Sequence, residues 1–212
     1  MNILQITAAL AACTAMSGCA IFGGQAISGQ GAELLDSSPG VDVSRLDDPA
    51  GEADFQAAYQ FIQGQDATTN MPNSGSATYL GGFGADATGD VNGFMTGALS
   101  MTVNNLNNGT VTGTADEFAL YNGDGSLNRD FSGEVFLNGG VTGTAITAAG
   151  TDNIRDNSTG QESDATLTLN GAFRDVTRQG RASAATGTAT GSGTGGFDFA
   201  LSDGKFFLVG QD

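Results

Sequence analysis

Apolar and polar residues alternate with a period of two along the second half of the chain. Met95, Leu99 and Val103 share one parity, and threonine, serine and alanine occupy most positions of the other parity. This alternation is typical of strands in a sheet with one buried face. Similar segments, separated by Gly, Asn and Asp, predict strands at about 77–84, 95–103, 110–120, 130–137, 140–148, 164–174, 181–191 and 197–209.

Eight antiparallel strands are enough to close a barrel that side chains fill, which leaves no open sheet edge. The sequence therefore predicts an all-β fold, a single small antiparallel eight-stranded β-barrel over residues 77–212. A change of parity between Val111 and Phe118 predicts a β-bulge near Asp116 and Glu117. The pentapeptide Val-Thr-Gly-Thr-Ala at 111–115 recurs at 141–145, and more loosely at 185–189, which we interpret as one strand pattern used three times.

Glycine is unusually frequent, with 34 residues among 212. Because glycine within a strand marks a bend, a bulge or a close backbone approach, we interpret the glycines as the positions at which a small barrel bends. The aromatic residues of 77–212 are predicted to form the core: Tyr79, Phe83, Phe94, Phe118, Tyr121, Phe131, Phe136, Phe173, Phe197, Phe199, Phe206 and Phe207.

Residues 19–76 have a different composition, in which eight acidic residues are opposed by Arg45 alone. Such a composition predicts a flexible acidic tether. Within it, Phe55, Tyr59 and Ile62 follow spacings of four and three, which predicts a short helix over 53–63. This helix either docks on the barrel or presents the three side chains to a partner.

The first 18 residues are apolar and uncharged and are followed by a cysteine, Cys19. With Met16, Ser17 and Gly18 before it, this cysteine resembles the lipidation site of a bacterial lipoprotein signal peptide. The resemblance implies a signal peptide over 1–18, lipidation of Cys19, and outer-membrane anchoring because Ala20 stands where a retention signal has aspartate. Cys13, after Leu10-Ala11-Ala12, is a second candidate that leaves a signal of only 12 residues.

The run from Met71 to Gly81, with Pro72, Ser74, Gly75, Ala77 and Tyr79, resembles the entry to the β-barrel domain of transferrin-binding protein B-like surface lipoproteins. The Val-Thr-Gly-Thr repeats and Phe131-Ser132-Gly133 are similar to the same domain. The resemblance implies a lipid-anchored outer-membrane protein, exposed on the cell surface, whose monomeric barrel binds a protein or other extracellular partner. Because the chain has one barrel rather than two lobes, transferrin binding itself is not implied.

Composition narrows the chemistry further. The net charge is −16 and histidine is absent, which argues against nucleic-acid partners and excludes a histidine-dependent triad, zinc site or haem site. We therefore expect no catalysis, no cofactor and no metal, and we interpret Asn122-Gly123-Asp124-Gly125 as a hairpin turn rather than a calcium loop. The alternative function is a lipocalin-like periplasmic barrel that carries a small apolar ligand in a pocket of roughly 300 Å³ or more.

Three arginines, Arg174, Arg178 and Arg181, lie close together in a very acidic chain. One interpretation is a hairpin loop whose charges pair with Asp175 or Glu162 and keep the barrel soluble. The other is a contact with an acidic partner or with the lipid headgroups beside the anchor. We interpret Asp116, Glu117 and the 152–156 carboxylates as solvated loop charges rather than an acid and base pair.

Overall fold

The computed structural model describes residues 51–72, 74–106, 108–176 and 182–211, and most of them belong to one antiparallel sheet. A helix precedes the main strands. In chain order the elements are α2 (Glu52–Gln63), β1 (Asp66–Ala67), β2 (Ser76–Gly89), β3 (Gly93–Asn104), β4 (Thr110–Tyr121), β5 (Leu127–Gly133), β6 (Val135–Thr142), β7 (Ala145–Asp156), β8 (Glu162–Asp175), β9 (Ala184–Gly195) and β10 (Phe199–Gln211).

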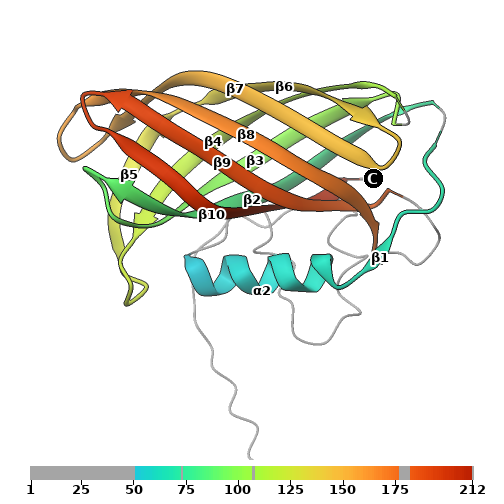
Figure 1. Cartoon of the computed structure of the whole chain (residues 1–212), viewed down its shortest axis with the longest axis horizontal. Helices are drawn as coiled ribbons and strands as arrows, with labels where there is room; N and C mark the ends of the chain where they lie inside the picture. The colour runs from blue at the N-terminus through green and yellow to red at the C-terminus, as the bar shows by residue number, and fades with distance from the viewer. Residues whose placement is uncertain (1–50, 73, 107, 177–181, 212) are drawn as a thin grey trace, which may run out of the picture.

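The sheet closes on itself, since the first long strand, β2, pairs with the last strand, β10. β5 and β6 are two halves of one strand: both pair with β4 on one side and with β7 on the other. The closed ring is therefore β2, β3, β4, β5/β6, β7, β8, β9 and β10, which is visible as a tilted barrel in Figure 1. The predicted fold class, an all-β barrel with a ring of eight antiparallel strands, is confirmed.

The predicted bulge lies in β4. Ala98 of β3 pairs with Asp116, whereas Thr96 pairs with Ala119, so two residues of β4 lie opposite a single residue of β3 and β4 has one extra residue there. Glu117 has a φ of 51°, in the left-handed region. The bulge turns Phe118 and Leu120 toward the interior although Val111 and Ala115 have the other parity.

One pair of strand boundaries was predicted wrongly. The strand expected at 130–137 is an interrupted strand over β5 and β6 that continues to Thr142, and the chain then turns at Gly143, whose φ is 59°. The segment expected as a strand at 140–148 therefore spans the end of β6, this turn and the start of β7. The second copy of the pentapeptide, 141–145, therefore spans a turn rather than a strand. The predicted strand bounds place a turn at 138–139, but Gly139 lies within β6, where a side chain would overlap the carbonyl oxygen of Thr147.

Eight of the twelve predicted core aromatics fill the barrel: Tyr79, Phe83, Phe118, Phe131, Phe173, Phe197, Phe199 and Phe206. The other four differ from the prediction. Phe94 and Phe207 are buried outside the barrel, under α2, because they have the parity of the outer face. Tyr121 is half-buried, and Phe136 is 56% exposed because its neighbours Val135 and Leu137 point inward.

Glycines inside the barrel lie beneath aromatic rings. A Cβ added to Gly187 would come within 2.6 Å of the Phe206 ring and would also overlap Gly171 on the next strand. A Cβ added to Gly97 would likewise overlap the Phe83 ring, and one added to Gly171 would overlap the Phe206 ring. None of these three glycines has a positive φ, so what they supply is room for the rings rather than an unusual backbone conformation.

Candidate functional site

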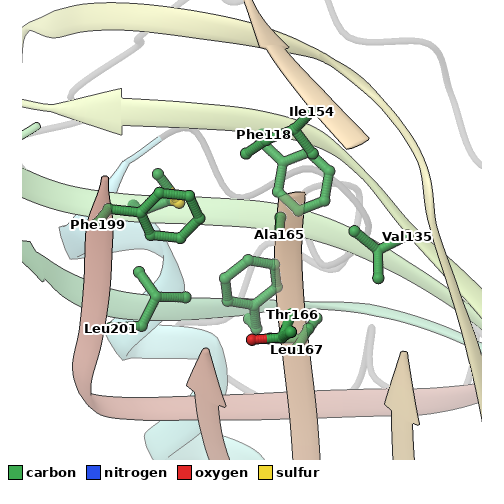
Figure 2. Close-up of a pocket in the computed structure, with 10 residues that line it drawn as sticks. Phe118, Val135, Ile154, Ala165, Thr166, Leu167, Phe199 and Leu201 are labelled. Carbon is green, nitrogen blue, oxygen red and sulfur yellow. The ribbon is translucent and has the colours of Figure 1, made fainter. Parts of the chain in front are cut away.

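The interior of the barrel is almost completely filled by side chains. It contains a cavity of about 10 Å³, whose lining includes Phe118, Leu167 and Phe199. Figure 2 shows these side chains converging from different strands. Pockets that hold small organic ligands have volumes of roughly 300 Å³ or more. In this structure the interior is a packed core.

The outer face of the barrel carries the predicted helix. Phe55 and Ile62 are fully buried and Tyr59 is 8% exposed, so the hydrophobic side of α2 faces the barrel. The Phe55 ring centroid lies 5.9 Å from that of Phe94 and 5.7 Å from that of Phe207. This is the docked arrangement. The three side chains predicted as a partner surface form the contact between helix and barrel, so they offer no exposed surface in this conformation.

Gly84 forms the floor of the α2 contact. A Cβ at Gly84 would lie 2.8 Å from the Phe55 ring and 2.6 Å from the Phe94 ring. The helix contacts β9, β10, β2 and β3, and it therefore crosses the seam where the first and last strands of the ring meet. The short strand β1 then pairs with β8. Within the predicted 19–76 tether, the segment from residue 51 to Ala67 is thus folded onto the barrel.

Of the arginine cluster, the structure describes only Arg174, and Arg178 and Arg181 lie outside the described residues. Arg174 is half-buried, and its Nε donates a hydrogen bond of 3.4 Å to the Thr186 hydroxyl. Burial raises the pKa of Tyr59, and the nearby positive charge of Arg174 partly opposes that rise. Glu162 is the first residue of β8 and Arg174 is near the other end of the same strand. The two side chains are therefore too far apart for the ion pair that was one of the expectations for the arginine cluster.

Two carboxylates that were interpreted as solvated loop charges are partly or fully buried. Asp116 is half-buried at the β4 bulge, and burial, together with the negative charge of Glu134, raises its pKa. Asp156 is fully buried at the end of β7 and accepts a hydrogen bond of 2.8 Å from Arg129 Nη1. The sequence did not distinguish them from exposed acids because their burial depends on the bulge and on the turn after β7.

The Asp156 carboxylate holds the loop between β7 and β8. Burial opposes its ionisation, but hydrogen bonds from the side chain and backbone of Ser158, from Arg129 and from the Thr159 backbone prevail and hold its pKa at about 2. The carboxylate therefore remains ionised far into the acid range, and it ties the loop to β5.

Asp156 should make stability fall steeply in acid. Because its folded pKa of about 2 is below the unfolded value of 3.8, the stabilisation is complete above pH 3.8 and is lost as the pH falls through 2. We expect this loss to be about 2 kcal/mol in urea unfolding between pH 5 and pH 2. Asp156→Asn should be less stable at pH 5 and should lack this part of the pH dependence, whereas Asp164→Asn, at an exposed site on β8, should retain it. An unchanged profile in Asp156→Asn would contradict the assignment.

The 122–125 segment is a hairpin turn, as predicted. Gly125 N–H donates to the Asn122 carbonyl at 2.9 Å, and Asp124 Oδ1 accepts from the backbone and hydroxyl of Ser126. These hydrogen bonds lower the pKa of Asp124. In the part of the chain that the structure describes, no three Cys, Asp or Glu residues are grouped as a metal site would need.

Leu127 and Phe136 are the large hydrophobic side chains most exposed among the described residues, at 58% and 56%. Leu127 starts β5 beside a turn, whereas Phe136 is in β6 on the wall of the barrel. Phe136 was predicted to lie in the core. Strand parity was the signal that could have corrected this, since both neighbours of Phe136 are apolar and only one parity can face inward.

The chain matches no family model, no curated protein and no solved structure. Among the residues described, no helix has the length and apolar character needed to cross a membrane.

Proposed function

We propose that this chain is a lipid-anchored outer-membrane protein whose barrel is a non-catalytic binding module exposed on the cell surface. The observation that carries the proposal is the packed interior: a cavity of about 10 Å³ has no room for an organic substrate or ligand. The surface available to a partner is therefore the outside of the barrel and its turns. The lipocalin-like alternative gains no support from such an interior.

The resemblance of residues 71–81 to the entry of transferrin-binding protein B-like barrels supports the same proposal. So does the position of that run, since residues 76–81 begin β2, the first strand of the closed ring. Cys19 precedes the described part of the chain by about 30 residues, enough for the barrel to stand away from a membrane. Several acyl chains on one cysteine would give stable anchoring.

Lipidation is tested by labelling cells with radioactive palmitate. We expect the label on the wild-type protein and on Cys13→Ser, and complete loss of the label in Cys19→Ser, which should also fail to fractionate with membranes as the mature form. Cys13→Ser is the matched control because it changes the other cysteine of the same segment. Label that persists in Cys19→Ser and disappears in Cys13→Ser would move the anchor to Cys13, and label in neither wild type nor variants would refute the anchor.

A further inference from the structure

The barrel has a large outer surface without charge. β6 and β9 contain no charged residue, and neither do the first half of β7 at 145–151 and the central part of β8 at 165–173, although the whole chain has a net charge of −16. The outward side chains there and on β4 form what we call the threonine wall: Thr110, Thr112, Thr114, Phe136, Asn138, Thr147, Ala149, Thr151, Thr166, Thr168, Asn170, Thr188, Thr190 and Ser192.

The threonine wall is continuous across five strands. Its central row runs through Thr112, Asn138, Ala149, Thr168 and Thr190, each paired with the next across a strand boundary. Neighbouring positions in such a row are about 4.8 Å apart. In Figure 1, β6 and β7 lie on the side of the barrel away from α2. The helix does contact β9, at the end that contains Ala184, but Thr188, Thr190 and Ser192 of the same strand are exposed.

Phe136 lies at the edge of this wall, directly opposite Thr114. The next side chains on the same outer face are those of Asp116 and Glu134, whose negative charges interact. The β-propensity of threonine explains why threonine is common on an exposed strand face, but it explains neither an exposed phenylalanine nor the missing charges. The backbone around Phe136 is fixed because Val135 and Leu137 are each 1% exposed in the core. The wall thus presents one aromatic ring, with hydroxyl and amide groups on one side of it and the carboxylates of Asp116 and Glu134 on the other.

We propose that the threonine wall binds a neutral glycan chain, with a sugar ring stacked on Phe136. Hydroxyl and amide side chains can both donate and accept hydrogen bonds, as sugar hydroxyls require. The negative face of an aromatic ring attracts the polarised C–H groups on the face of a sugar ring. This proposal deepens the proposed function, since it uses the outer surface of the barrel, but it does not depend on the lipid anchor.

The charges favour a neutral glycan over other partners. A polyanion would find no cation on the wall and would be repelled by Asp116 and Glu134 at its edge. A protein interface of standard size would need a larger apolar centre than Phe136 and Ala149 provide. Hydroxyls and amides around a single ring therefore fit a polyhydroxylated, uncharged chain best.

The wall is also ordered before binding. Threonine is β-branched and has few χ1 rotamers, so little side-chain entropy remains to be lost. Some of its groups are already held in place: Thr166 Oγ1 lies 3.1 Å from Ser192 Oγ, and the Thr188 hydroxyl donates to the Asn170 carbonyl at 3.4 Å. A closed barrel holds these groups at fixed distances from one another.

The test titrates the full-length lipidated protein, in detergent, with neutral hexasaccharides of glucose, mannose and N-acetylglucosamine, and with the hexasaccharide of galacturonic acid as a charged comparator. Isothermal titration calorimetry should show binding of a neutral hexasaccharide and not of the charged one. Phe136→Ser and Thr168→Asp, at two places on the wall, should each weaken that binding at least about tenfold. Their melting temperatures should stay close to that of wild type, because both side chains point outward.

Leu127→Ser is the matched control, since it removes the other exposed large hydrophobic residue, nine positions from Phe136 along the same interrupted strand. It should bind as wild type does. No binding of any neutral hexasaccharide at millimolar concentration, or equal binding by Phe136→Ser, would overturn the proposal. So would Phe136-dependent capture of a protein without any saccharide binding. Palmitate labelling of Cys19 is unaffected by these outcomes, so failure of the glycan proposal is distinguishable from failure of the anchor.

Discussion

Phe55→Ala is expected to undock α2 from a barrel that stays folded. The ring is fully buried between Phe94 and Phe207, and truncating a buried phenylalanine to alanine costs about 3–5 kcal/mol. A helix of 12 residues is marginal in water without tertiary contacts, so a loss of this size should unfold α2 locally. Hydrogen exchange followed by mass spectrometry should show fast exchange over Glu52–Gln63 and near-native protection of β3 through β10.

Gln60→Ala is the matched control for this prediction, because Gln60 is exposed on the other side of the same helix. It should leave the exchange of α2 unchanged, since alanine also favours helix. Wild-type protection of α2 in Phe55→Ala would contradict the docked arrangement. Faster exchange throughout the barrel would show instead that α2 is needed to hold the β2–β10 seam closed.

Gly187→Val is expected to destabilise the barrel itself by about 3 kcal/mol, at the upper end of overpacking costs. Valine is a far better strand former than glycine, so propensity alone would predict stabilisation. The added atoms, however, would meet the Phe206 ring and the backbone of Gly171. A lower free energy of urea unfolding would show that Gly187 is needed to leave room for the Phe206 ring. A higher one would show that strand propensity decides the effect.

The second variant in this test reduces the ring. Phe206→Leu combined with Gly187→Val should be less destabilised than the sum of the two single variants, because both changes act on the same contact. Gly123→Ala serves as the control, since a Cβ there has no atom within 4 Å and should change stability by less than about 0.5 kcal/mol. Additive effects of Gly187→Val and Phe206→Leu would contradict the proposed role of the glycine.

Strand number and closure could be predicted because alternation is a local signal and each strand carried it. The bulge at Asp116 and Glu117 was predictable for the same reason, since it reverses the parity of one strand. The turn at Gly143 was missed because the chain was expected to turn at 138–139, where Gly139 in fact lies within a strand. The sequence alone does not distinguish a glycine that allows a close backbone approach from a glycine that forms a turn.

Which aromatic residues face inward could be predicted only in part. Phe206 and Phe207 are adjacent, so one of them must face outward, and composition alone could not show that α2 covers Phe207. The spacing of Phe55, Tyr59 and Ile62 predicted the helix, but not which of two surfaces its apolar side contacts. Phe136 was assigned to the core because aromatic residues are usually buried, and the structure instead exposes it on the outer face of the barrel.

The surface location of the barrel is tested most directly by trypsin on intact cells. Between Cys19 and residue 76 the sequence offers trypsin a single site, Arg45. Cleavage there should release soluble barrel material whose N-terminal peptide begins at Leu46, and Arg45→Gln should prevent its release. We predict release of this material from intact wild-type cells, identified by mass spectrometry of its N-terminal peptide. Release only after the outer membrane is permeabilised would place the barrel inside the cell envelope and contradict the account.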